Sequence, residues 1–130
     1  MSSMKLEYLG VINEYDDEII RLYGFDQLEA AKFRSVIQSA LLDKKHELDL
    51  GSVDFITPLN CSLKLRISAE DIGIISDDKE HFYCDLTYAG YQQMVELLEP
   101  FCEKDGLGYY QWLYNLDNPI EFLFSPGGWW

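Results

Sequence analysis

The segment SLKLRIS (Ser62–Ser68) has the clearest strand pattern in this chain of 130 residues. Three aliphatic residues alternate with Lys64 and Arg66, and successive side chains of a strand point to opposite faces. The alternation predicts one solvated face and one apolar face that other elements must cover, which is typical of an antiparallel strand. We expect helices to pack against the apolar face, formed by Leu63, Leu65 and Ile67.

Further strands are predicted on both sides of this segment by runs of β-branched and aromatic residues. Their predicted ranges are residues 5–12, 18–25, 53–59, 81–86 and 120–125. A short apolar strand is expected within residues 69–80, whereas the aromatic segment 109–116 does not favour one element over another.

A first helix is predicted to begin after Asp26, whose carboxylate can accept from the free N–H groups of the first turn. Glu29, three residues later, completes a capping box. Lys44 and Lys45 are expected in the last turn, where cations suit the helix dipole. The inner face has helical spacing and consists of Phe33, Val36, Ile37, Ala40 and Leu41.

A second helix is predicted after Thr87, which can cap its first turn. Pro100 is expected to end or kink this helix, because proline removes a backbone donor and restricts the residue before it. The predicted inner face consists of Tyr91, Met94, Val95 and Leu98. Together these elements predict a single α+β domain over residues 1–130, in which two helices pack on one face of a mostly antiparallel sheet of about five to seven strands.

The charge of the chain limits its partners. Its 23 acidic and 10 basic residues give a net charge of −13, which repels phosphate backbones and anionic lipids, so we expect no nucleic-acid partner and no membrane partner. The acidity either keeps an aromatic-rich protein soluble or attracts a basic protein. The sequence has neither a signal-peptide pattern near residue 1 nor an apolar run of about 20 residues, and we expect a cytoplasmic protein.

The cysteines and histidines give little support to catalysis or metal binding. Cys61, Cys84 and Cys102 are odd in number and widely spaced, and we expect buried thiols without a disulfide. His81 and Cys84 could form a nucleophilic pair, but a spacing of three on a strand puts them on opposite faces. No metal or cofactor motif is present, and an enzyme is neither excluded nor supported.

Three basic residues, Arg21, Lys64 and Arg66, fall on predicted strands and could share the open face of the sheet. One interpretation is that they pair with acids on neighbouring strands, such as Asp54 or Asp85. The other is that they form a basic and aromatic patch for an anionic ligand or for a partner's carboxylates.

Aromatic residues gather in the last quarter of the chain and suit either an interface or a core. Those proposed for a binding surface are Tyr110, Trp112, Trp129 and Trp130. The final segment FSPGGWW (Phe124–Trp130) contains a Pro-Gly-Gly turn, and we expect it to bring both tryptophans back onto the sheet, because an exposed pair would favour aggregation.

Two main functional hypotheses follow. The first is a non-catalytic protein–protein interaction domain of the inhibitor or immunity type, which binds a basic partner through the sheet face and the aromatic residues. The second is a small-molecule binding protein, or an enzyme, whose pocket joins Arg21, Lys64 or Arg66 to the aromatic residues and takes an anionic ligand. A homodimer formed through the aromatic patch is a third possibility.

Overall fold

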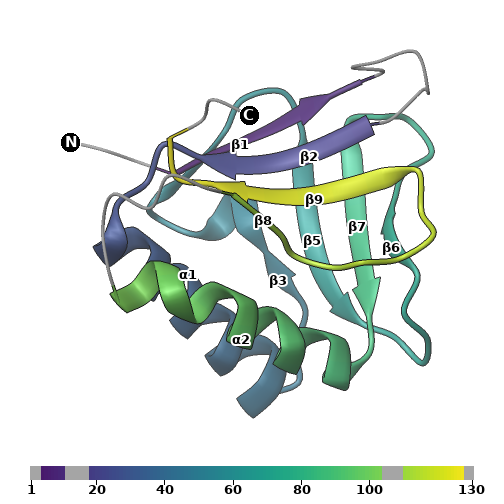
Figure 1. The fold of residues 1–130 in the computed structure, drawn as a ribbon. Helices are drawn as coiled ribbons and strands as arrows, with labels where there is room; N and C mark the ends of the chain where they lie inside the picture. Colours follow the sequence, from purple (N-terminus) through teal and green to yellow (C-terminus); the bar gives the residue numbers. More distant parts are fainter. Residues whose placement is uncertain (1–3, 11–17, 104–109, 128–130) are drawn as a thin grey trace.

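Two mixed β-sheets and two α-helices form the fold in a computed structural model of the chain, which describes residues 4–10, 18–103 and 110–127 (Figure 1). The first sheet has the strand order β4-β1-β2-β9-β8 and the second has the order β3-β5-β7-β6. In the first sheet the strands are β1 (Met4–Leu9), β2 (Glu18–Tyr23), β4 (Ile56–Pro58), β8 (Gln111–Trp112) and β9 (Ile120–Ser125). In the second sheet they are β3 (Leu48–Asp49), β5 (Ser62–Ile67), β6 (Gly73–Ile75) and β7 (His81–Leu86).

The α+β class is confirmed, but the expected arrangement of the strands is corrected in two respects. The strands form two sheets rather than one, and each sheet mixes parallel with antiparallel pairs. Strand β5 pairs antiparallel with β3 over two residues and parallel with β7 along its whole length. Its alternating pattern records which face is buried, and burial of one face does not determine the direction of the neighbouring strand.

Helix α1 (Gln27–Ile37) begins as predicted. The backbone N–H of Glu29 donates to the Asp26 carboxylate at 2.8 Å, and Glu29 accepts from the backbone N–H of Asp26 at 3.4 Å, which completes the capping box. The predicted helix continues beyond Ile37 as a π-helical turn, η1 (Gln38–Asp43), and Lys44 caps its end. A single 3₁₀ turn, η2 (Leu50–Ser52), comes later and precedes β4.

Helix α2 (Tyr88–Glu103) also begins as predicted, since the backbone N–H of Gly90 donates to Thr87 Oγ1 at 3.0 Å. The helix does not end at Pro100, as one of the two expected outcomes had it, but continues to Glu103. Phe101, just past the proline, is 2% exposed and meets Phe124 edge to face at 5.2 Å. Burial of this ring offsets the loss of one helical hydrogen bond.

Both helices lie on the same side of the sheets, side by side (Figure 1), and one apolar core joins all the layers. Tyr91 is buried at the centre of this core, and its hydroxyl lies 2.8 Å from the carbonyl oxygen of Arg66 and 2.7 Å from that of Cys84. This group therefore connects α2 to both β5 and β7. The largest fully buried side chains include Phe33, Ile37, Met4, Leu6, Ile20, Leu22, Phe82, Tyr91, Phe122 and Phe124.

Side chains connect the two sheets at one end. The Tyr8 ring of β1 meets the Phe82 ring of β7 in a tilted arrangement with ring centroids 4.8 Å apart, and the Tyr8 hydroxyl donates to Glu18 of β2. Lys79, which precedes β7, lies 2.9 Å from the same carboxylate. Burial alone raises the pKa of Glu18, but the hydrogen bonds from Tyr8 and Lys79 outweigh it and lower that pKa. Burial and the carboxylate of Glu18 raise the pKa of Tyr8 to about 12.

The segment between β8 and β9 connects the sheets at the other end. The Tyr114 hydroxyl accepts from the backbone N–H of Ile74 at 3.0 Å and donates to the carbonyl of Ile120. The Asn118 amide donates to the carbonyls of Ile72 and Ile74 at 2.7 and 3.2 Å. Gly73 has a φ of +93°, and a side chain there would overlap Asn118 Nδ2, so only glycine permits this approach.

The expected return of the C-terminal segment stays a prediction, because Trp129 and Trp130 lie outside the described residues. The described part of that segment passes close to the end of β2, since the backbone N–H of Gly24 donates to the carbonyl of Pro126 at 3.1 Å. Neither described helix combines the length and the apolar composition that crossing a membrane requires.

Candidate functional site

The three basic residues proposed for one patch lie on two different sheets. Arg21 is on β2 of the first sheet, where its guanidinium donates to Glu7 of β1 at 2.7 and 2.9 Å. The same guanidinium lies 4.0 Å from the ring centroid of Tyr23. Arg21 is therefore held by a carboxylate on one side and an aromatic ring on the other.

Arg66 and Lys64 do share a face, on β5 of the second sheet. Arg66 forms a two-point contact with Asp85 of β7 at 2.7 and 2.9 Å and lies 4.2 Å from the ring centroid of Tyr83. Lys64 makes a looser contact, because its Nζ lies 3.9 Å from a carboxylate oxygen of Glu47. The Lys64 side chain is 41% exposed. Of the two interpretations of the basic residues, the structure shows the first for Arg21 and Arg66, because each pairs with an acid on the neighbouring strand.

A well-formed cleft lies elsewhere, where α2 passes the edge strand β8. It has a volume of about 440 Å³ and continues into a smaller cavity of about 210 Å³. Gln93 and Leu97, one turn apart on α2, form one wall, and the segment from β8 to Leu116 forms the other. The complete lining of the larger cleft is Gln93, Leu97, Gln111, Trp112, Tyr114, Asn115, Leu116 and Glu121.

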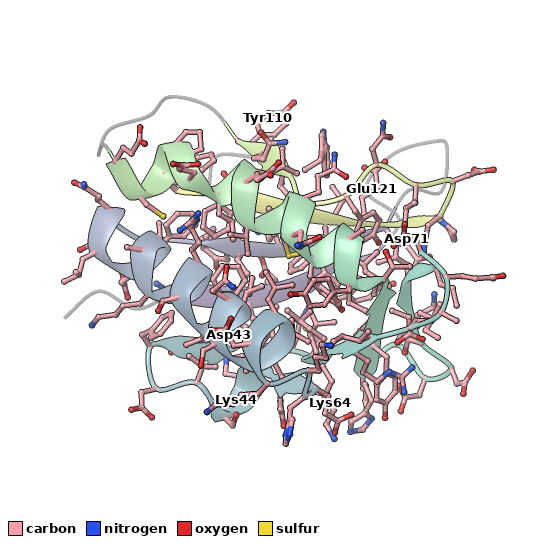
Figure 2. All side chains as sticks on the ribbon, turned by 90° about the horizontal axis from the view of Figure 1, so that it is seen from below. Asp43, Lys44, Lys64, Asp71, Tyr110 and Glu121 are labelled. Atoms are coloured by element: carbon pink, nitrogen blue, oxygen red, sulfur yellow. The ribbon has the colours of Figure 1, made fainter. Side chains whose placement is uncertain are left out.

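The charged groups of this lining are acidic. Glu121 lines the larger cleft and Asp71 lines the smaller cavity, and among the described residues no lysine or arginine lines either of them. Figure 2 shows Glu121 and Asp71 on the same side of α2, away from Lys64 and Lys44. Asp71 accepts from the backbone N–H and hydroxyl of Thr87 at 2.8 and 2.9 Å, which fixes its carboxylate at the start of α2.

The remaining polar groups of the cleft are carboxamides beside an aromatic ring. Gln93 and Asn115 are exposed, and Gln111 is half-buried with its Nε2 donating to the Trp112 carbonyl at 2.9 Å. Trp112 is half-buried as well, and Tyr110 meets it edge to face at 5.7 Å. The wall formed by residues 113–116 is held in place by the bonds from Tyr114 to both sheets.

A second cavity, of about 400 Å³, lies beside the first turn of α1. It is lined by Asp26, Gln27, Leu28, Ala31 and Cys102. The Asp26 carboxylate already caps α1, and Gln27 Nε2 donates to the Cys102 carbonyl of α2 at 2.9 Å. These polar groups of the cavity are therefore engaged within the chain.

The separation predicted for His81 and Cys84 is confirmed. Cys84 is fully buried in the core, whereas His81 is exposed at the start of β7. Burial raises the pKa of the Cys84 thiol to about 12, so this thiol is protonated at neutral pH and is not a nucleophile. Cys61 is half-buried, and burial raises its pKa to about 11.

One exposed group has the composition of a metal site. The ligand atoms of Asp78, Glu80 and His81 lie within 4.8 Å of one another. Asp78 accepts from the backbone N–H groups of Glu80 and His81 at 2.9 and 2.8 Å and from the His81 ring at 2.8 Å. This pattern of bonds is typical of a turn that is stabilised by its own aspartate. The same bonds lower the pKa of Asp78 and raise the pKa of His81.

Of the five proposed residues that the structure describes, Trp112 alone lines the cleft, and the Tyr110 ring meets the Trp112 ring edge to face. Trp129 and Trp130 lie outside the described residues. Sequence reasoning missed the carboxamides and Glu121, because glutamine and asparagine are common on surfaces and their spacing carries no motif. No family model, curated protein or solved structure matches this chain, so its function must be argued from its own geometry and charge.

Proposed function

We propose that this protein is a non-catalytic interaction domain of the inhibitor or immunity type, and that its partner is a basic protein. The observation that carries the proposal is how its charges are distributed. Among the described residues, Arg21, Lys64 and Arg66 on the strands pair with acids of the same chain, whereas most of the described acids are exposed. The surface therefore presents negative charge to an approaching molecule.

Four internal ion pairs involve basic residues on or next to the strands, whereas Lys5 of β1 lies over the ring of Tyr23, 5.8 Å from its centroid. Arg21 with Glu7 and Arg66 with Asp85 are partly buried pairs with hydrogen bonds of 2.7 to 2.9 Å. Lys79 with Glu18 and Lys64 with Glu47 are the other two. The exposed acids include Asp43, Asp54, Glu70, Asp71, Asp77, Glu96, Glu99, Glu103 and Asp117.

This distribution suits long-range attraction. A net charge of −13 on 130 residues raises the rate at which a basic partner arrives, and this effect weakens with salt because charges more than about 10 Å apart are screened at 0.1 M. The separation of Cys84 from His81 supports a role without a covalent intermediate, since the one nucleophilic pair that the sequence offered does not form.

The test is affinity capture from a lysate of the organism that carries the gene, at low salt, with an unrelated protein of equal size and charge as control bait. We expect one basic protein to be enriched over the control, and the purified pair to form a 1:1 complex whose affinity falls with salt. Size-exclusion chromatography of the chain alone is run first, because a homodimer could use the same surface. If the control bait captures the same proteins in the same amounts, the proposal is wrong.

Small-molecule binding is the second candidate, and the cleft beside α2 favours it. A volume of about 440 Å³ falls in the range of small-molecule pockets. An anionic ligand has less support than the sequence suggested, because Arg21, Lys64 and Arg66 do not line this cleft. A thermal-shift screen that compares matched anionic, neutral and cationic compounds tests this candidate, which loses its support if no compound raises the melting temperature.

A further inference from the structure

The two halves of the chain repeat one arrangement of strands and helices. The first half runs from β1 to β5 and consists of the antiparallel pair β1–β2, the helix α1 and the antiparallel pair β3–β5, with β4 added at the edge of the sheet. The second half runs from β6 to β9 and consists of the antiparallel pair β6–β7, the helix α2 and the antiparallel pair β8–β9. The order of the elements and the directions of the strands therefore agree between the halves.

The two helices agree in detail as well. Asp26 caps α1 by accepting from the backbone N–H three residues later, and Thr87 caps α2 in the same way. Buried side chains follow each cap at the same three positions, which are the fourth, seventh and eleventh residues after it. They are Ala30, Phe33 and Ile37 in α1 and Tyr91, Met94 and Leu98 in α2.

Each sheet is assembled from both halves. In the first sheet, β2 of the first half pairs parallel with β9 of the second half along all six residues of each strand. In the second sheet, β7 of the second half pairs parallel with β5 of the first half, again along six residues. The last pair of strands of each half therefore completes the sheet that the other half begins (Figure 1).

Side chains join the halves in addition to the strands. Arg66 of the first half forms its two-point contact with Asp85 of the second half at 2.7 and 2.9 Å, and Arg34 Nε of α1 donates to the Val95 carbonyl of α2 at 3.0 Å. The Tyr91 hydroxyl of the second half lies 2.8 Å from the carbonyl oxygen of Arg66. Directional contacts of this kind fix how one half docks on the other.

We propose that a second copy of this chain is a partner of the fold and binds by exchange of halves. In the exchanged dimer the first half of each copy packs against the second half of the other copy, so the contacts that join the halves of the monomer form again, twice. Since the same contacts hold both forms together, the protein concentration and the connection between the halves decide which form is present. This inference does not rest on the proposed function.

The connection between the halves, residues 68–72, passes over the end of β7. The backbone N–H of Ser68 donates to the Leu86 carbonyl at 2.8 Å on the side of β5, and that of Ile72 donates to the Asp85 carbonyl at 2.9 Å on the side of β6. Because β7 lies between β5 and β6, the two ends of the connection are about two strand spacings, or roughly 10 Å, apart.

The length of this connection decides whether one chain can close on itself. Four chain steps join Ser68 to Ile72, and at about 3.6 Å for each step they reach about 14 Å, which is enough for the gap. Removal of Ala69 and Glu70, which are both exposed, leaves two steps and a reach of about 7 Å. One shortened chain then fails to bond to both sides of its own β7, whereas in the exchanged dimer the two ends bond to different copies of β7.

The first experiment refolds the full chain from urea at about 10 µM and at about 1 mM, because a short connection gives the closed chain an effective concentration in the millimolar range. We expect a monomer at the lower concentration and a dimer at the higher one, measured by size-exclusion chromatography with light scattering. The net charge of −13 makes two copies repel, so the dimer fraction is expected to rise with salt, whereas the complex with a basic partner weakens with salt. If no dimer forms at the higher concentration, the proposal is wrong.

Carbodiimide coupling shows whether the dimer is exchanged. Lys79 of the second half lies 2.9 Å from Glu18 of the first half, and this contact is within one chain in the monomer but between two chains in the exchanged dimer. The control is Lys64 with Glu47, which lie 3.9 Å apart and both belong to the first half. When ¹⁴N and ¹⁵N chains are refolded together and coupled, we expect peptides linked through Lys79 and Glu18 to carry both labels in the dimer, and peptides linked through Lys64 and Glu47 to carry one. A dimer in which both kinds of peptide carry one label is not exchanged, and it overturns the proposal.

A shortened connection tests the geometry of the exchange. The chain without Ala69 and Glu70 is expected to refold as a dimer even at about 10 µM. The matched control, Ala69→Gly with Glu70→Gly, keeps the length of the connection and is expected to stay monomeric at that concentration. If both variants are monomeric, the length of the connection does not act as proposed. If the shortened chain does not fold, refolding and coupling of the unaltered chain decide.

Discussion

Replacement of Tyr91 by phenylalanine tests how α2 is fastened to the second sheet. The change keeps the buried ring and removes only the hydroxyl, which lies 2.8 Å from the Arg66 carbonyl and 2.7 Å from the Cys84 carbonyl. Because Tyr91 is fully buried, water cannot replace the lost donor. A buried group left without its partner costs about 1–3 kcal/mol, and at this chain length each kcal/mol lowers the melting temperature by about 3–5 °C.

The matched control is Tyr83→Phe, the same chemical change on β7 at a half-buried position where the described chain provides no hydrogen bond to the hydroxyl. We expect Tyr91→Phe to lower the melting temperature by about 3–15 °C and Tyr83→Phe to change the free energy of unfolding by less than about 0.5 kcal/mol. Both are measured by circular dichroism during heating and by urea unfolding at one pH. Equal effects of the two changes would refute the role assigned to the Tyr91 hydroxyl.

Three further predictions concern other parts of the molecule. Gly73→Ala is expected to lower the free energy of unfolding by about 2 kcal/mol or more, because the alanine would have to keep a φ of +93° and its Cβ would overlap Asn118 Nδ2. Gly51→Ala is expected to be nearly neutral. Glu18→Gln is expected to flatten the loss of stability in acid, because the pKa of Glu18 is lowered despite its burial. In the wild-type chain the ionised Glu18 stabilises the fold fully above the ordinary glutamate pKa, and this stabilisation is lost as the pH falls through the lowered pKa of Glu18. Urea unfolding at several pH values measures this loss. Native thiol labelling, followed by mass spectrometry, is expected to modify Cys61 before Cys84, and rapid labelling of Cys84 would contradict its burial.

Local features of the fold could be predicted from the sequence because they depend on residues close together in the chain. The capping box of Asp26 and Glu29 formed as expected, and so did the cap at Thr87. The alternation in β5 correctly identified its buried face. In each case the deciding contact is at most four residues away or follows directly from the strand period.

The partition into two sheets could not be predicted in this way. Strand β2 pairs with β9 and β5 pairs with β7, and both pairs are parallel. Nothing within either strand encodes the direction of its neighbour, because the same buried face serves both directions. The candidate cleft was missed for a related reason. Its walls come from α2 and the segment around β8, and they meet only once the strand order is known.

The position of β9 has a consequence for the synthesis of the chain. This strand lies between β2 and β8, inside the first sheet, although it follows β2 by roughly a hundred residues. A ribosome that adds about 5–20 residues per second needs roughly 5–20 s to cover that distance. Throughout that interval the nascent β1–β2 hairpin keeps one edge open, with Ile20 and Leu22 uncovered by the strand that later packs beside them. An open apolar edge of this kind is a substrate for chaperones and a starting point for aggregation, so the yield of folded protein depends on how quickly the distant strand arrives.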